Sequence, residues 1–96
     1  MSELALQRIR ENIQKHRRGE DARLLDLGNC GMTEVPEEIG ECVWLEELVL
    51  SGEWLDYDLE NGSLGIQTST NEGTANKIEC FPAALSRLIN LKKVKT

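Results

Sequence analysis

The sequence predicts a small α/β protein in which one helix precedes a short array of repeats and a β-hairpin is inserted within the array. Three observations support this prediction. The segment 1–19 is amphipathic, a mixed spacing of apolar residues recurs along the chain with a constant period, and alternating apolar and polar residues flank Asn61-Gly62. With 96 residues, the chain has the length of one small domain, so we predict a single domain over 1–96.

The N-terminal segment 1–19 is expected to form a helix that caps one end of the array. Leu6, Ile9 and Ile13 recur at intervals of three and four residues, which places them on one face of a helix. Gly19 follows directly after three basic residues, and glycine commonly follows the C-terminus of a helix. We therefore expect the helix to span 3–18 and to cover the core with its apolar face.

Residues 22–50 contain the pattern L-x-x-L-x-L-x-x-N/C-x-L, which is typical of a leucine-rich repeat with a period of about 23 residues. The repeat positions are first occupied by Ala22, Leu25, Leu27, Cys30 and Met32. The leading positions recur one period later and again two periods after that, at Leu45, Leu48, Leu50, Leu91 and Val94. This recurrence predicts a short solenoid in which each repeat buries the apolar face of its neighbour.

The segments that begin with Val35-Pro36 and Phe81-Pro82 resemble each other at an offset of two periods. We expect each proline to start a short helical return on the outer side, because its missing N–H costs nothing at the first helical position. The repeat leucines are expected to point inward from short parallel strands of a curved sheet. A polar side chain at the Asn or Cys position, as at Cys30 and Asn76, is expected to bond the neighbouring loops. Residues 78–96 form the last predicted repeat.

Residues 51–77 interrupt the array, and the sequence leaves two alternatives for them. They form either an insertion or one degenerate repeat. Two alternating runs, at 54–60 and 63–68, are separated by Asn61-Gly62, which is the strongest short-range signal for a hairpin turn. The sequence therefore favours a projecting β-hairpin with its turn at Asn61-Gly62.

The stretch at 25–40, Leu-Asp-Leu-Gly-Asn-Cys-Gly-Met-Thr-Glu-Val-Pro-Glu-Glu-Ile-Gly, resembles bacterial intracellular leucine-rich repeat proteins. It is most similar to the N-terminal cap and first repeats of Roco-type proteins. The resemblance implies a non-enzymatic scaffold that binds another protein. An alternative is that the chain is the N-terminal cap of a larger multidomain sensor or signalling protein whose activity lies elsewhere. The chain has no G-x-x-x-x-G-K-S/T phosphate loop, so the GTPase activity of Roco-type proteins is not implied.

Charge is distributed unevenly along the chain, whose net charge is −6. Residues 24–81 contain thirteen acidic residues and one lysine, whereas residues 82–96 contain four basic residues and no acid. An acidic centre repels phosphate groups, so we expect no nucleic-acid partner. The sequence has neither a long apolar run nor a signal-peptide pattern, so we expect a cytoplasmic protein without membrane contact.

We expect no enzymatic activity. The three cysteines, Cys30, Cys42 and Cys80, lie far apart, and His16 is the single histidine, so a zinc site of four closely spaced ligands is not available. Buried thiols are expected rather than a catalytic thiol–imidazole pair, because reactive cysteines require exposed electropositive surroundings. No metal, cofactor or small-molecule substrate is therefore predicted.

Seven residues are predicted to contact a protein partner. Five lie beside the inward-pointing leucines of the predicted strands and are expected to face the concave side: Asp26, Glu47, Val49, Lys93 and Lys95. Trp54 and Tyr57 lie on the predicted hairpin, and exposed aromatic residues dominate the energy of many interfaces. Trp54 has a second interpretation, as a hydrophobic lid on the edge of the sheet. Trp44 is expected to pack on the outer side of the array.

Overall fold

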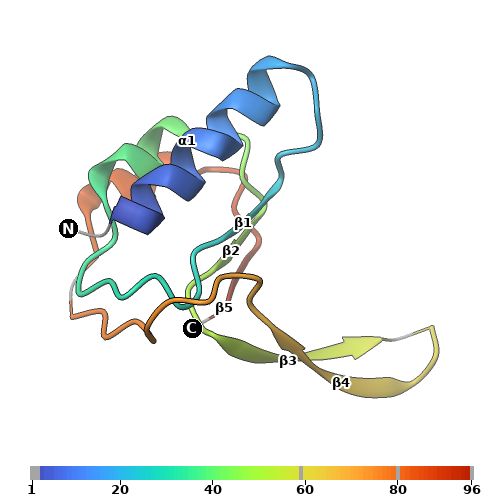
Figure 1. Cartoon of the computed structure of the whole chain (residues 1–96). Coiled ribbons are helices and arrows are strands. Elements are labelled where there is room, and N and C mark those ends of the chain that lie inside the picture. The colour runs from blue at the N-terminus through green and yellow to red at the C-terminus, as the bar shows by residue number, and fades with distance from the viewer. Residues whose placement is uncertain (1–2, 59, 80, 96) are drawn as a thin grey trace.

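One α-helix, two short 3₁₀ helices and five strands form the part of the chain that the computed structural model describes, namely residues 3–58, 60–79 and 81–95. Side chains are described for these residues except 56–58. The predicted α/β fold is confirmed at the level of one α-helix and a small parallel sheet. Figure 1 shows the helices on one side of the parallel strands and a hairpin that projects away from them.

The helix α1 spans Glu3–Arg17, and its buried face differs in part from the predicted one. Ile9 is completely buried, as predicted, whereas Leu6 is only partly buried. The polar residue Asn12 is buried instead. Its Nδ2 group donates a hydrogen bond to the carbonyl oxygen of Ala22 at 3.1 Å, which offsets the cost of removing the amide from water.

The end of α1 is a Schellman motif centred on Gly19, the predicted stop residue. Gly19 adopts a φ of 77°, a left-handed conformation that glycine reaches without steric strain. The N–H of Gly19 donates to the carbonyl oxygen of His16 at 3.1 Å, and the N–H of Glu20 donates to that of Lys15 at 2.9 Å.

No helix within the described ranges has the length and apolarity needed to cross a membrane.

Three short strands form the parallel sheet, in the order β1-β2-β5. They are β1 (Leu24–Asp26), β2 (Glu47–Val49) and β5 (Lys93–Lys95). The register aligns Leu25 with Leu48, and Leu48 with Val94, so equivalent positions of the repeat pattern lie side by side. Leu25 and Leu48 are buried, which makes their face of the sheet the core face.

The outer segments are the 3₁₀ helices η1 (Glu37–Glu41) and η2 (Ala83–Arg87), and each begins directly after a proline. Their bounds are offset by two of the predicted periods, as are those of β2 and β5, whereas β1 and β2 are offset by one. The two 3₁₀ helices pack against each other. Gly40 permits this close approach, because a Cβ at that position would lie 2.9 Å from the Cβ of Ala84.

The core lies between the sheet, α1 and the outer segments. The predicted inward leucines of the first two strands and their flanks are buried, and Leu27, Leu45 and Leu48 are completely inaccessible to water, whereas Leu91 is only partly buried. The core cluster also contains residues from α1, from the loops and from both 3₁₀ helices or their flanks: Ala5, Ile9, Cys30, Met32, Val35, Ile39, Cys42 and Leu88. Burial of apolar surface in one contiguous cluster is the main stabilising contribution to a domain of this size.

Asn76 connects neighbouring loops from the position predicted for a bridging polar residue. Its Oδ1 accepts hydrogen bonds from the N–H groups of Cys30 at 3.1 Å and Met32 at 2.9 Å. Its Nδ2 donates to the carbonyl oxygens of Leu27 at 2.8 Å and Leu50 at 2.9 Å. One side chain therefore satisfies four backbone groups where the first two strands end.

The strands β3 (Glu53–Asp58) and β4 (Ser63–Thr68) pair antiparallel and form a sheet of their own. Gly62, in the turn that joins them, has a φ of 65°. The predicted hairpin is therefore confirmed. The described residues of 51–77 add no strand to the parallel sheet, so the alternative of a degenerate repeat with a parallel strand is wrong.

Candidate functional site

The strand residues predicted to bind a partner lie together on one face of the parallel sheet, which we call the open face. The register places its residues in two rows, the first formed by Leu24, Glu47 and Lys93 and the second by Asp26, Val49 and Lys95. These residues point away from the core, because their neighbours Leu25 and Leu48 point into it. The structure thus brings together all five predicted strand residues.

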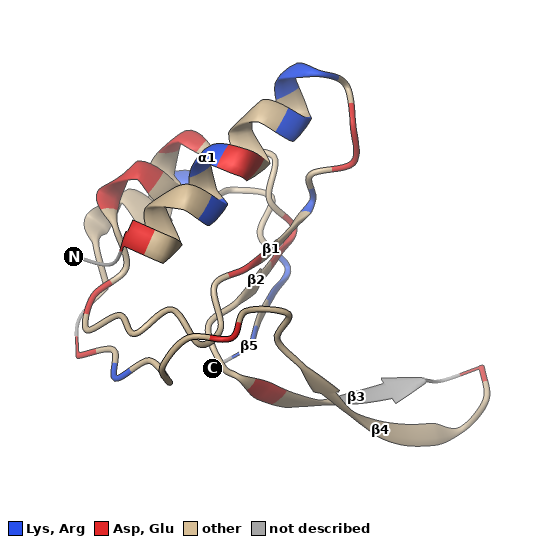
Figure 2. Ribbon diagram, viewed as in Figure 1, with Lys and Arg blue, Asp and Glu red and all other residues tan. Residues whose placement is uncertain are grey.

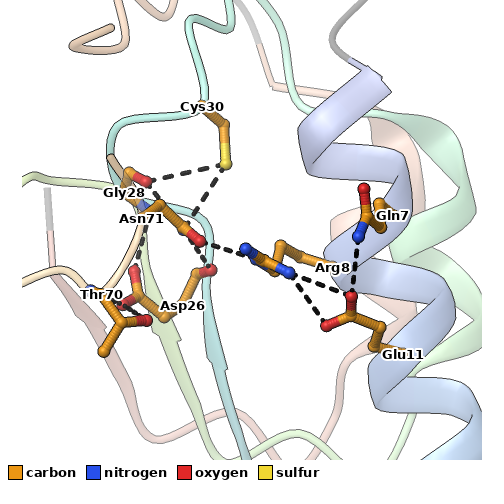
Figure 3. A network of polar contacts seen from close by, with 8 residues as sticks. All are labelled: Gln7, Arg8, Glu11, Asp26, Gly28, Cys30, Thr70 and Asn71. Carbon is orange, nitrogen blue, oxygen red and sulfur yellow. Dashed lines mark hydrogen bonds and ion pairs between the residues drawn. The ribbon is translucent and has the colours of Figure 1, made fainter. Parts of the chain in front are cut away.

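Asp26, a predicted contact residue, is partly buried, and its own chain binds its carboxylate (Figure 3). The hydroxyl of Ser69 donates to Oδ1 at 2.8 Å, and the N–H of Thr70 donates to Oδ2 at 3.0 Å. The N–H of Gly28 also donates to Oδ1, at 2.9 Å. These charge-assisted hydrogen bonds hold the segment that follows the hairpin against the end of β1.

Asn71 completes this junction and is itself buried. Its Nδ2 donates to the carbonyl oxygens of Asp26 at 3.0 Å and Gly28 at 2.9 Å, and its Oδ1 accepts from Nε of Arg8 at 2.6 Å. Arg8 also forms an ion pair with Glu11 at 3.0 Å. Figure 3 shows how this chain of contacts connects α1, β1 and the segment after the hairpin. The junction therefore has a structural role.

Val49 is a second predicted contact residue that has little accessible surface. Its side chain is completely buried although it lies on the open face. It lies in the central strand between Asp26 and Lys95, and Asp26 in turn binds the segment that follows the hairpin. Leu24, Glu47 and Lys93 keep accessible surface, as does Lys95, and they form the accessible part of the open face.

Three aliphatic side chains on the hairpin are strongly exposed, and we call them the hairpin apolar face: Leu55, Leu64 and Ile66. Their exposed fractions are 61%, 64% and 68%. Leu55 lies opposite Ile66 in the register, and Leu64 is two residues from Ile66 in β4. Strand alternation therefore places all three on the same side of the hairpin.

The aromatic residues predicted as contacts lie on the same hairpin. Trp54 lies opposite Gln67 and is half-buried. Because consecutive strand residues point to opposite faces, Trp54 lies on the face opposite Leu55. Tyr57 lies opposite Leu64 in the register, and its side chain lies outside the described part of the chain.

Trp44, predicted to pack on the outer side of the array, contacts α1. Its indole ring stacks on the imidazole of His16 with ring centroids 3.9 Å apart. Its Nε1 donates a hydrogen bond to Oδ1 of Asn12 at 2.7 Å. Trp44 therefore connects α1 to the segment that leads into β2, and it also provides a hydrogen-bond donor to the buried amide oxygen of Asn12.

A cleft of about 660 Å³ opens beside this stack, between the end of α1 and the segments 19–23 and 90–92. Charged groups at its wall already have partners. Nζ of Lys92 lies 3.1 Å from Oε1 of Glu46, and Nε of Arg23 lies 3.0 Å from Oδ1 of Asp21. The hydrogen bond from the Arg23 side chain lowers the pKa of Asp21 to about 2. The two ion pairs thus lie at the surface of the cleft, with much of each basic side chain exposed.

The described thiols are not arranged for catalysis. Cys30 and Cys42 are buried, and desolvation raises the pKa of each to about 11. Because the thiolate is the nucleophilic form, both thiols are less reactive near neutral pH than an exposed thiol with an ordinary pKa. Cys80 lies outside the described residues. Within the described residues, no group of three or more His, Cys, Asp and Glu side chains is placed to hold a metal ion.

Comparisons of the chain with protein-family models, with curated proteins and with solved structures found no match. The candidate site is therefore defined by geometry alone. It consists of the hairpin apolar face together with the accessible part of the open face. Relative to the sequence prediction, it omits Asp26, Val49, Trp54 and Tyr57, and it adds Leu24 and the three aliphatic residues of the hairpin.

Proposed function

We propose that the protein is a non-enzymatic module that binds another protein and is built on leucine-rich repeats of the type its sequence resembles. In this proposal, α1 caps a short solenoid with a curved sheet. The spacing of the observed elements supports it, because β1 and β2 begin one period apart and η1 and η2 begin two periods apart. The hydrogen bonds of Asn76 at the position typical of a bridging asparagine support it as well.

The observation that carries the proposed function is the exposure of the hairpin apolar face. Complete burial of one leucine or isoleucine side chain contributes about 1.5–3 kcal/mol, and the fold obtains little of this from these three side chains. An isolated two-stranded hairpin is only marginally stable in water. A partner that covers this face would therefore gain apolar contact area and stabilise the hairpin, as at known protein-binding patches.

The accessible part of the open face supplies a second kind of contact. Glu47 and Lys93 lie opposite each other in neighbouring strands, and Lys95 lies in the next row. Exposed charges of both signs contribute more to the choice of partner and to the association rate than to affinity. We therefore assign affinity to the hairpin apolar face and selectivity to these charges.

Site-specific photo-crosslinking tests this function. A photoreactive phenylalanine derivative at Leu64 should form crosslinks to a defined set of proteins in cells that make the chain. The matched control places the same group at Val43, which is 46% exposed but lies outside the candidate site. The proposal predicts crosslinked products from Leu64 that are absent from Val43. No products from Leu64, or the same products from both positions, would contradict it.

A further inference from the structure

Equivalent residues that lie two periods apart in the repeat pattern differ in how completely they are buried. Leu48 of β2 is completely buried, whereas Val94, its neighbour in register on β5, is 46% exposed. Val35 is 2% exposed, whereas Phe81, at the equivalent position of the later copy, is 54% exposed. Among the described residues, β5 therefore lacks the kind of neighbour that β5 itself provides for β2.

The outer edge of β5 offers backbone groups to a further strand. The N–H of Lys93 donates to the carbonyl oxygen of Glu46 at 3.1 Å, and the carbonyl oxygen of Lys95 accepts from the N–H of Leu50 at 2.7 Å. Alternate residues of a strand direct their backbone groups to opposite neighbours, so the N–H and C=O of Val94 point away from β2. An extended segment can hydrogen-bond to the sheet at Val94.

The charge of this edge indicates which kind of segment fits. Residues 92–95 contain three lysines, and Figure 2 shows blue along β5. On its inner edge, β5 is already paired with β2, which contains an acidic residue. Nζ of Lys92 lies 3.1 Å from Oε1 of Glu46, and Lys93 lies opposite Glu47 in the register. The inner edge thus shows that a strand combining leucine with glutamate complements β5.

We infer that the outer edge of β5 binds an acidic, extended segment of a separate protein, which adds as a parallel strand in the manner of β2. An apolar residue of that segment lies beside Val94, and a carboxylate lies beside Lys93, as Leu48 and Glu47 do on the inner side. A second copy of β5 does not fit, because pairing two such strands places lysines beside lysines. The inference rests on the proposed protein-binding function and adds a surface separate from the hairpin apolar face.

The test uses a fluorescent peptide with the sequence of residues 45–50, Leu-Glu-Glu-Leu-Val-Leu, titrated with the full chain. We expect saturable binding that weakens with added salt. Replacing both glutamates of the peptide by lysine should weaken binding at least about tenfold, and so should the chain variant Lys93→Glu/Lys95→Glu. The control Arg10→Glu/Lys77→Glu changes the net charge equally at exposed residues elsewhere and should bind like the wild type.

A backbone variant separates strand addition from simple charge attraction. Val94→Pro removes the outward N–H but leaves the inner hydrogen bonds of β5 in place, and proline is tolerated on the free side of an edge strand. It should abolish peptide binding while the urea midpoint stays near that of the wild type. Absence of binding to the wild type, or equal weakening by the Arg10/Lys77 control, would overturn the inference.

Two further outcomes are informative. Self-association that Val94→Pro removes would assign the edge to a second copy of the chain and would also overturn the inference. Ile66→Ser should leave peptide binding unchanged, because the hairpin apolar face is a different surface. Loss of crosslinking at Leu64 and loss of peptide binding at β5 are thus separate results, so the failure of one proposal is distinguishable from the failure of the other.

Discussion

The parallel sheet and the hairpin use the same residue type in opposite ways. Leu25 and Leu48 of the sheet are buried, whereas Leu55 and Leu64 of the hairpin are mostly exposed. Both regions obey strand alternation, so the difference lies in what covers each face. The core cluster includes residues of α1 and of the outer segments packed on the sheet leucines, and no described element covers the hairpin apolar face to that extent. Leucine therefore contributes to the core in one region and remains exposed to water in the other.

The largest effect is expected from removing a leucine of the sheet. Leu48→Ala should lower the free energy of unfolding by about 2–5 kcal/mol, because it removes contacts in the core and leaves a cavity. Urea denaturation measures this value. A loss below about 1 kcal/mol would contradict the proposed difference between the two regions, since leucines of the sheet would then contribute little more than surface residues.

The next effect concerns the polar connection inside the same region. Asn76→Ala removes four hydrogen bonds to backbone groups and should lower the free energy of unfolding by about 2–4 kcal/mol. The reason is that a backbone group left without a partner costs more free energy than a hydrogen bond contributes on balance. Asn90→Ala is the control, since Asn90 is exposed and its Nδ2 donates to the carbonyl oxygen of Val43. Equal losses from both variants would show that Asn76 has no special role.

The buried thiols test whether the sheet region excludes water. The pKa of Cys42 is raised to about 11 by burial, whereas an unfolded thiol titrates near its model value of 9.0. Between these two pH values the folded state keeps the Cys42 thiol protonated, whereas the unfolded state releases the proton. The free energy of unfolding is therefore constant below pH 9 with respect to this group and falls as the pH rises toward 11. Iodoacetamide should label Cys42 much more slowly in the folded chain than in urea, as measured by mass spectrometry. Equal rates would contradict burial.

The smallest effect on stability is expected in the hairpin. Ile66→Ser should change the free energy of unfolding by less than about 0.5 kcal/mol, because the side chain is already mostly in water. Ile39→Ser is the contrasting variant, since Ile39 is completely buried and should lose several kcal/mol, roughly as other core truncations do. Urea denaturation of both variants measures the difference in the free energy of unfolding between the two regions. A large loss from Ile66→Ser would assign the hairpin face to the fold.

Much of the fold could be predicted because its signals are local or periodic. The spacing of Leu25, Leu48 and Val94 predicts the register of the parallel sheet, and Asn61-Gly62 predicts the hairpin. Gly19 predicts the end of α1. The buried face of α1 is less predictable. Helix periodicity favours burial of Leu6, and it does not show that Asn12 is buried with hydrogen-bond partners.

The site was less predictable because it depends on contacts between distant segments. The carboxylate of Asp26 binds Ser69 and Thr70, which lie beyond the whole hairpin in the sequence, and no pattern in the sequence links them. Val49 lies on the open face as predicted, but the alternation of residues in the sequence does not show that its side chain is buried there. The alternation of Leu64 and Ile66 indicates one apolar side of β4, yet it does not show whether that side faces the core or water.

The most direct test of the central claim measures the binding of a partner isolated by crosslinking at Leu64. Its affinity should be compared for the wild type, Ile66→Ser and the control Val43→Ser by isothermal titration calorimetry. If the hairpin apolar face serves a partner, Ile66→Ser weakens binding at least about tenfold while its urea midpoint stays unchanged, and Val43→Ser binds like the wild type. Undiminished binding by a folded Ile66→Ser variant would contradict the claim.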